Sequence, residues 1–268
     1  MGNNMTLGQY LPGNSTIHRL DPRTKILLMI VYIVIIFVVD HIAVFALPAA
    51  FLVMMILLAK VPLSYLKSAI KPMRFLLIFM FIINLFLTQG EHELVSFWIF
   101  RITEEGVRQA LFITLRLLLL VAGTSMLTLT TSPIALTDGL EKLMQPLKVV
   151  HFPAHELAMM MTIALRFIPT LIEETDRIQK AQMARGADFE SGNLIARAKS
   201  MIPILVPLFV SAFRRADELA MAMESRCYHG GEGRTRMREL HMHKNDLFAF
   251  VITFSVLAAI FVIQALII

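Results

Sequence analysis

Long apolar runs separated by short polar or charged connectors constrain the fold of this chain more than any other feature. The runs are residues 26–39, 42–59, 75–88, 111–131 and 247–268. A helix of about 20 mainly apolar residues, range about 17–25, can cross the hydrocarbon core of a bilayer because its backbone hydrogen bonds are satisfied within the segment. The pattern predicts an all-α polytopic membrane protein with about five transmembrane helices.

Composition supports that class and excludes others. The chain is 57% hydrophobic and 17% charged, whereas a soluble domain is usually about 45–50% apolar and about 25% charged. Its single cysteine excludes an internal disulfide, and with it a secreted disulfide scaffold. The net charge of +5 is explained by lysine and arginine on the cytoplasmic side of a membrane protein, so no nucleic-acid partner is expected. Residues 1–22 lack an apolar core region, so no cleavable signal peptide is expected.

The charged connectors predict an orientation in the membrane. Three cations precede the first run, and the connector at residues 60–74 carries four more. The turn at Asp40 carries none, and four glutamates make residues 91–105 acidic. Because cytoplasmic loops collect lysine and arginine, the N-terminus is predicted to be cytoplasmic.

This orientation divides the chain into three parts. Residues 1–131 are expected to form about four spans, residues 132–245 a cytoplasmic region of amphipathic coupling helices, and residues 246–268 the C-terminal span. Two apolar patches inside the middle part, residues 157–168 and 201–210, are short and flanked by charge. We favour amphipathic helices lying against the bilayer or a partner for them; short additional spans are the alternative.

Polar residues near or inside the runs have local interpretations. Asp21 and Pro22 predict a helix start, because an aspartate can cap free N–H groups and proline suits the first helical position. Arg116 lies inside the fourth run, about one turn from its outer end, and is expected to extend its charge toward the interface. Asn84 is expected to bond a neighbouring helix.

Two arginine-centred tripeptides in the polar second half share one plan. They are Ala184-Arg185-Gly186 and Ser225-Arg226-Cys227. Each follows a predicted helix that begins at a proline. Small neighbours leave the guanidinium accessible to carboxylates or carbonyls of a partner, and methionines are adaptable at interfaces. The expected coupling surface beside the motifs consists of Met159, Met160, Pro169, Met183, Pro207, Met221 and Met223.

Each motif taken alone also fits a purely structural interpretation. An arginine near a helix C-terminus followed by glycine is ordinary capping and dipole stabilisation, and Gly186 can take the left-handed conformation. Cys227 stands where the first motif has glycine, which leaves the backbone geometry of the second motif open. Because the plan occurs twice, we favour docking of two similar partners.

Longer motifs point in the same direction. They are Ile17-His18-Arg19-Leu20-Asp21-Pro22-Arg23-Thr24-Lys25, Thr131-Ser132-Pro133, Ala164-Leu165-Arg166-Phe167-Ile168-Pro169 and Arg215-Ala216-Asp217-Glu218-Leu219-Ala220. Together with the two arginine motifs they resemble the transmembrane T component of energy-coupling factor (ECF) vitamin transporters, a CbiQ-like family. The resemblance runs over nearly the whole chain, and the combination is specific where each piece alone is weak.

The resemblance implies a complex with two related ABC-type ATPases and one membrane-embedded, substrate-binding S subunit, either exchangeable or dedicated. Arg185 and Arg226 would each dock one ATPase. ATP and Mg would bind the ATPases, so no catalytic residue, cofactor or metal is expected on this chain. The sequence contains no G-x-x-x-x-G-K-[ST] run, in agreement with that expectation.

Two alternatives stay open at this point. The first is a T subunit dedicated to one substrate, such as biotin, cobalt or nickel. The second is an intramembrane enzyme, which needs a nucleophile and base or metal ligands clustered at membrane depth. His151 and His155 are separated by Pro153, which disfavours a metal site. Cys227 has no evident general base.

Overall fold

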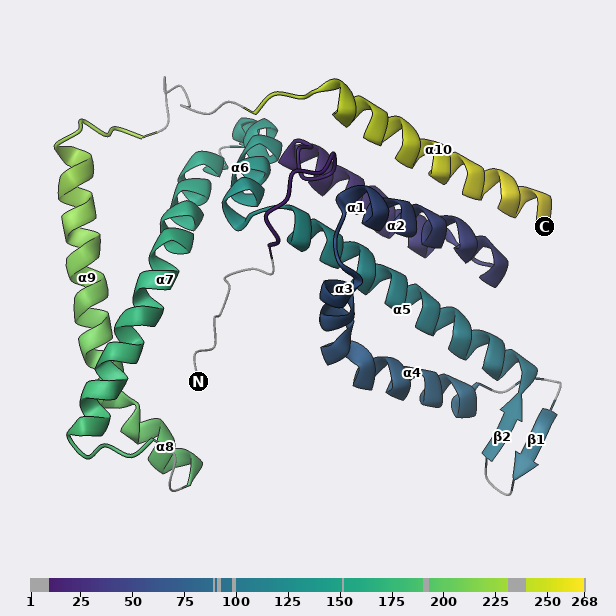
Figure 1. Cartoon of the computed structure of the whole chain (residues 1–268), viewed down its shortest axis with the longest axis horizontal. Coiled ribbons are helices and arrows are strands. Elements are labelled where there is room, and N and C mark those ends of the chain that lie inside the picture. The colour runs from purple at the N-terminus through teal and green to yellow at the C-terminus, as the bar shows by residue number, and fades with distance from the viewer. Residues whose placement is uncertain are drawn as a thin grey trace. The chain divides into compact units, whose positions relative to one another are not determined.

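The computed structural model describes residues 10–88, 90, 93–97, 100–150, 152–189, 193–230 and 240–267. They form two compact units (Figure 1), one from Met1–Leu143 and Glu239–Ile268 and the other from Met144–Arg238. We call these the membrane unit and the coupling unit. Glu91 and Trp98, in the acidic connector, lie outside the described residues.

The membrane unit is built almost entirely from helices. They are α1 (Pro22–Val38), η1 (Ile42–Phe45), α2 (Ala46–Ala59), α3 (Leu63–Ile70), η2 (Lys71–Met73), α4 (Arg74–Leu87), α5 (Glu104–Thr130), α6 (Pro133–Met144) and α10 (Lys244–Ile267). A short antiparallel hairpin of β1 (Glu93–Phe97) and β2 (Phe100–Thr103) lies where the sequence predicted only a connector. The predicted all-α class is therefore confirmed, with this hairpin as a small addition.

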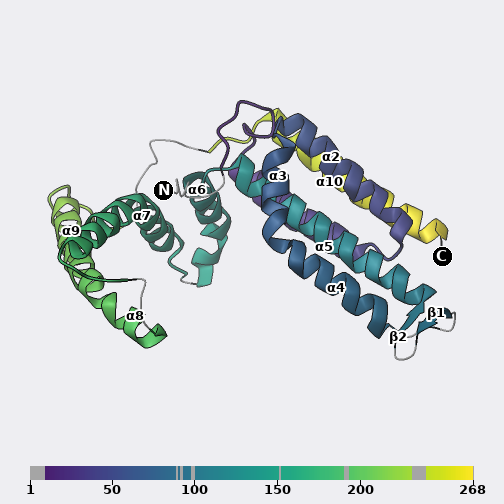
Figure 2. The ribbon, with the colours of Figure 1, turned by 60° about the horizontal axis from the view of Figure 1, so that its bottom comes forward.

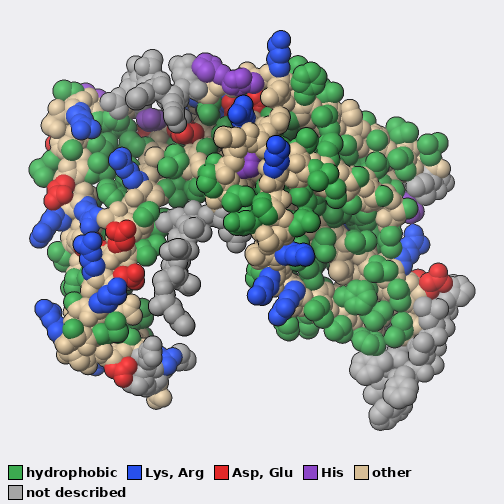
Figure 3. Space-filling view, viewed as in Figure 1, with side chains coloured by type: hydrophobic (Ala, Val, Ile, Leu, Met, Phe, Trp, Pro, Cys, Tyr) green, Lys and Arg blue, Asp and Glu red, His purple; other side chains and the backbone are tan. Residues whose placement is uncertain are grey.

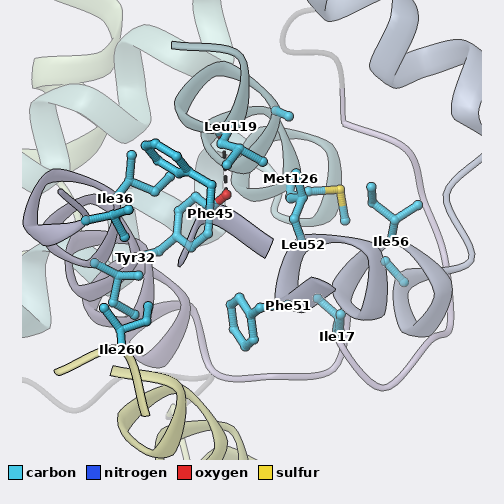
Figure 4. Packing of buried hydrophobic residues seen from close by; sticks show 14 of the residues in the cluster. Ile17, Tyr32, Ile36, Phe45, Phe51, Leu52, Ile56, Leu119, Met126 and Ile260 are labelled. Carbon is cyan, nitrogen blue, oxygen red and sulfur yellow. Dashed lines mark hydrogen bonds between the residues drawn. The ribbon is translucent and has the colours of Figure 1, made fainter. Parts of the chain in front are cut away.

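The central helix is α5, which packs against α1, α2, α3 and α4. The core lies where α1, α2, α5 and α10 meet (Figure 4), and Ile35, Ile36, Leu129 and Ile260 are fully buried in it. The Tyr32 hydroxyl donates to the carbonyl of Leu119 at 3.1 Å. A Cβ at Gly123 would overlap the Tyr32 ring, so only glycine allows this close approach of α1 and α5.

Many apolar side chains point outward from the membrane unit. Leu57 is 71% exposed and Phe75 is 77% exposed. On the face shown in Figure 3, green apolar side chains cover most of this unit. A soluble protein rarely exposes so much contiguous apolar surface, whereas lipid chains would cover it.

In the part of the chain that the structure describes, five helical segments are long and apolar enough to cross a membrane by length and composition. They are Ile42–Ala59, Leu63–Leu87, Glu104–Thr130, Ala154–Ala184 and Lys244–Leu266. The number agrees with the prediction, but the set differs. The first predicted span becomes α1, whose 17 residues are roughly 25 Å long, short of the ~30 Å hydrocarbon core. The fifth candidate span is instead Ala154–Ala184, because the patch at residues 157–168 is part of this one continuous helix.

Local signals at the start of α1 act as predicted. The Asp21 carboxylate accepts from the backbone N–H of Arg23 at 2.9 Å, and Pro22 occupies the first helical turn. At the other end of α1, Gln264 of α10 donates to the carbonyl of Val38 at 3.0 Å. The bond from Gln264 to Val38 joins the C-terminal ends of the two helices, and the bond between Asp21 and Asp246, described below, joins their N-terminal ends. Helices α1 and α10 therefore run in the same direction.

Two polar residues inside the runs bond to backbone carbonyls, and the prediction for Asn84 was wrong. The Arg116 guanidinium donates to the carbonyl of Val39 at 2.7 Å and lies 4.5 Å from the centre of the Phe112 ring; the extension of its charge toward the interface stays a prediction. The bond to Val39 satisfies a carbonyl at the end of α1, which has no partner within its own helix. The Asn84 amide donates to Met80, four residues earlier in the same helix, and not to a neighbouring one.

The coupling unit contains η3 (Gln145–Val150), α7 (Ala154–Ala184), α8 (Leu194–Ser200) and α9 (Ile202–Glu224). Helices α7 and α9 lie side by side in both views (Figures 1 and 2) and are in contact. The predicted helix starts at Pro169 and Pro207 were wrong, because both prolines lie inside helices. A proline removes one hydrogen bond and strains the helix, yet here the helix continues on both sides of it.

Candidate partner-docking site

The first arginine motif ends α7 in a Schellman motif. Gly186 takes a left-handed φ of 88°, as predicted. Its N–H donates to the carbonyl of Met183 at 2.9 Å, and the N–H of Ala187 donates to the carbonyl of Gln182 at 2.9 Å. These two bonds satisfy carbonyls at the helix end and fix Arg185 as the last residue before the chain turns away.

The second motif ends α9 in the same way. Cys227 takes a left-handed φ of 54°, although it is not glycine. Its N–H donates to the carbonyl of Glu224 at 2.8 Å, and the N–H of Tyr228 donates to the carbonyl of Met223 at 3.1 Å. The question that the sequence left open is therefore answered: the cysteine occupies the position of Gly186, at a cost of about 1–2 kcal/mol for the left-handed backbone.

The two motifs consequently present their arginines alike. Arg185 follows the last residue of α7, and Arg226 lies two positions after the last residue of α9. Each directly precedes the left-handed residue of its motif, and both are exposed. The flanking residues are exposed as well: Ala184, Gly186, Ser225 and Cys227. Neither guanidinium is packed into the chain's own core, so each is accessible to another molecule.

An ion pair joins the two helices between the motifs. The Arg215 guanidinium donates to the Glu174 carboxylate at 2.7 Å, and both side chains are partly buried. Arg185 follows Glu174 by 11 residues, and Arg226 follows Arg215 by 11 residues. At 1.5 Å per residue, each arginine lies roughly 16 Å along its helix from this contact.

The helices run in opposite directions past this contact. Helix α7 runs toward α8, and α9 begins directly after α8 and runs away from it (Figure 1). The two arginines therefore lie at opposite ends of the pair, up to roughly 33 Å apart. Each arginine therefore lies at the C-terminal end of its helix, at a similar distance from the ion pair.

The predicted coupling-surface residues are spread around the two helices. Met160, Pro169, Met183, Pro207 and Met221 are exposed, whereas Met159 and Met223 are half-buried. Successive helical residues point 100° apart, so Met221 and Met223 lie on nearly opposite sides of α9. The helices do not gather these methionines into one stripe.

A different set of residues forms a stripe on α9. Val206, Phe209, Val210 and Phe213 are 57%, 61%, 55% and 68% exposed. Their spacing of i, i+3, i+4 and i+7 places them on one face. We call these four residues the α9 stripe. Sequence reasoning found the patch at residues 201–210 but missed Phe213, although the same spacing would have revealed it.

Within the residues that the structure describes, no group of three or more His, Cys, Asp or Glu side chains could hold a metal ion. His151, one of the two histidines weighed as metal ligands, lies outside the described residues. Cys227 is an exposed free thiol, and its left-handed backbone conformation turns the chain after α9.

Comparisons with known proteins agree with the geometry. Residues 13–237 match the CbiQ family, described as Cobalt transport protein. The chain is 57% identical over 249 residues to the energy-coupling factor transporter transmembrane protein EcfT of Thermosediminibacter oceani, covering 93% of this chain and 94% of that protein. It is 46% identical over 260 residues to EcfT of Bacillus subtilis, covering 97% and 98%. The resemblance seen in the motifs is thereby confirmed: the chain belongs to the CbiQ family, as a transmembrane component of energy-coupling factor transporters.

Proposed function

We propose that this chain is the scaffold and energy-coupling subunit of an ATP-driven importer of a vitamin or micronutrient. It would join two ABC-type ATPases to a membrane-embedded S subunit that binds the substrate. The observation that carries the proposal is the pair of exposed arginines in matching caps, equally far from the contact between their helices. Two similar sites suit two similar partners.

Each arginine cap would dock one ATPase. A guanidinium offers five donors in a planar fork, which suits carboxylates or a ring of carbonyls in a groove. An arginine buried in such a groove is typically worth about 2 kcal/mol or more of binding free energy. ATP and Mg would bind the ATPases, and this chain would be a non-catalytic subunit.

The crossing of α7 and α9 would turn ATPase motion into motion of the S subunit. When two ATPases approach each other on binding ATP, the ends at Arg185 and Arg226 would be displaced. The ion pair between Glu174 and Arg215 would act as the contact about which the helices rotate. Partly exposed ion pairs contribute only about 0–1 kcal/mol, so this contact permits rotation.

The α9 stripe would contact the S subunit. Two phenylalanines and two valines exposed on one face are costly to leave in water, at roughly 25 cal/mol per Å² of apolar surface. An apolar, membrane-embedded partner would cover them. The methionines near the stripe, Met159, Met160, Met183, Met221 and Met223, would adapt to partners of different shape.

Orientation and location complete the proposal. The start of α1, the end of α5 and the start of α10 lie at one end of the membrane unit. Three cations at or just before the start of α1, Arg19, Arg23 and Lys25, support a cytoplasmic position for this end, and hence a cytoplasmic N-terminus. Five charged residues between Glu173 and Lys180 favour a cytoplasmic position for α7, despite its length.

Co-purification tests the proposal. The tagged chain would be produced with the two ATPase candidates of its genome and extracted in mild detergent. We expect both ATPases to co-elute with the wild type and to be lost from the double variant Arg185→Glu/Arg226→Glu. Arg177→Glu, an exposed arginine two turns before Arg185, is the matched control and should retain them. An intact complex with unchanged uptake in the double variant would refute the docking role.

A further inference from the structure

A short stretch at the start of α1 is bonded to both segments that flank the coupling unit in sequence. The downstream flank is the chain before α10. The N–H of Asp21 donates to the Asp246 carboxylate at 2.8 Å, and the same carboxylate accepts from the N–H of His243 at 2.7 Å. Asp246 is only 1% exposed, so these bonds take the place of water around its carboxylate.

Arg23 adds a second connection to the downstream flank. Its Nε and Nη2 donate to the two oxygens of Asp21 at 3.0 and 2.8 Å, and Nη2 also donates to the carbonyl of Leu240 at 3.0 Å. The paired bonds to Asp21 hold the guanidinium in one orientation. Leu240 is therefore held by an arginine that is already fixed in place.

The upstream flank is the end of α5 with α6. Lys25 is 7% exposed, and its Nζ donates to the carbonyl of Thr130 at 2.9 Å and to that of His18 at 3.1 Å. In α6, a Cβ at Gly139 would lie 3.0 Å from the Cβ of Pro22. Both ends of the chain that leads into and out of the coupling unit thus meet residues 21–25.

Burial of the charged groups favours a fixed arrangement of these connections. A charged group removed from water is stabilised by its hydrogen bonds, so a change that breaks them leaves the charge uncompensated. Asp21, Lys25 and Asp246 are all under 10% exposed. Two apolar surfaces can shift past each other at little cost in free energy, whereas these hydrogen bonds are made in only one relative position of the segments. We call Asp21, Arg23, Lys25 and Asp246 the α1 clamp.

We propose that the α1 clamp is a set of positioning residues for energy coupling: it fastens both flanks of the coupling unit to α1. Displacement of α7 and α9 that reaches these flanks then moves α1 and the core around Tyr32. This inference rests on the proposed function, since it assigns the route by which ATPase work enters the membrane unit.

The test measures coupling separately from assembly. In the complete transporter reconstituted in vesicles, Asp246→Asn and Lys25→Met should retain the ATPases and ATP hydrolysis. Substrate imported per ATP hydrolysed should fall about fivefold or more, the lower end of ordinary coupling free energies. Arg19→Gln, an exposed arginine of the same segment, should leave that ratio unchanged. An unchanged ratio in both clamp variants, with the complex intact, would overturn the clamp.

A disulfide keeps the proposal testable if those variants fold poorly. Pro22→Cys/Gly139→Cys, in a Cys227→Gly background that leaves no other thiol on this chain, should form a disulfide between α1 and α6. The two Cβ positions are close to the separation found in disulfides. The closed bridge should leave import per ATP intact and restore it in Lys25→Met, but not in Asp246→Asn, which loosens the other flank. Import stopped by oxidation would overturn the clamp, because the contact would then have to open. Failure of the wild type to bind ATPases would instead refute the proposed function.

Discussion

The membrane unit and the coupling unit differ in how far they bury their own side chains. Helix α5 alone buries eight residues. Helices α7 and α9 together bury three, namely Ala154, Ala158 and Ile204. The first unit is held by its own core, whereas the two helices of the second share few buried side chains and are joined by an ion pair between Glu174 and Arg215.

This difference indicates that the membrane unit is stable on its own, whereas the coupling unit is suited to change conformation. A helix pair with a small core opens at low free energy and gains most of its stabilisation from partners. Substitutions in the membrane unit should therefore lower the stability of the isolated chain. Substitutions in the coupling unit should mainly alter binding.

The largest effect on stability is expected at Gly123. Gly123→Val places side-chain atoms where the Tyr32 ring lies, so α1 and α5 must separate. Overpacking of this kind costs about 1–3 kcal/mol, which should appear as a lower melting temperature in detergent. Ala258→Val, at an exposed position of α10, is the control. Equal melting temperatures for the two variants would contradict the close approach of α1 and α5.

The α9 stripe should show the opposite behaviour. Phe209→Gln/Phe213→Gln should leave the melting temperature of the isolated chain unchanged, because both rings are exposed. Retention of the S subunit on the detergent-solubilised complex should weaken about tenfold or more, the loss expected for an interface anchor. Arg214→Gln, a neighbouring exposed residue, should have no such effect. Full retention of the S subunit would assign the stripe to another partner or to lipid.

Smaller effects of opposite sign are expected at the two caps. Gly186→Ala must force alanine into a φ near 88°, whereas Cys227→Gly relieves a left-handed φ at a non-glycine residue. Backbone strain of about 1–2 kcal/mol, partly offset by the entropy of the unfolded chain, leaves a net change of roughly 0.5–1 kcal/mol in each case. Hydrogen exchange should accelerate at the Ala187 amide in the first variant and slow at the Tyr228 amide in the second. Changes of the same sign at both amides would show that the caps are not equivalent.

The smallest effect concerns pH. Burial lowers the pKa of His18 below its ordinary value of 6.5; the bond to the Leu11 carbonyl opposes this, and the charge of Lys25 adds to it. A neutral ring donates from Nε2 to Leu11 and accepts at Nδ1 from the Ser15 hydroxyl, 2.7 Å away.

The sign of the pH effect follows from the lowered pKa. The unfolded chain binds a proton to His18 at a higher pH than the folded chain does. The stabilisation is complete above about pH 6.5 and declines as the pH falls from there toward the folded-state pKa. Thermal melts should show this decline in the wild type and a flatter profile in His18→Gln. Identical pH profiles would remove His18 as the cause.

Local signals in the sequence predicted much of this structure. Apolar runs marked most of the helices, since a run of sufficient length has few other stable conformations in a membrane. Asp21 and Pro22 marked the start of α1 because a cap depends on residues a few positions apart. The docking residues Arg185 and Arg226 were found because the same pattern occurs twice; their role stays a proposal.

Features that depend on distant contacts were missed. Whether Pro169 ends or only strains a helix depends on how that helix packs, so its predicted start was wrong. The pair of Glu174 with Arg215 joins residues 41 positions apart, and no local spacing signals it. The bond from Arg116 to the carbonyl of Val39 joins residues 77 positions apart, so no local spacing signals it either.

The most direct test of the coupling account is a distance between the ends of α7 and α9 in two nucleotide states. Ala181 and Ala222 are exposed and lie four residues before Arg185 and Arg226. Spin labels on Ala181→Cys and Ala222→Cys, in a Cys227→Gly background, would report this distance by electron paramagnetic resonance in the complete, transport-competent complex. The account predicts different distance distributions with and without a non-hydrolysable ATP analogue. Identical distributions in a complex that still transports would contradict it.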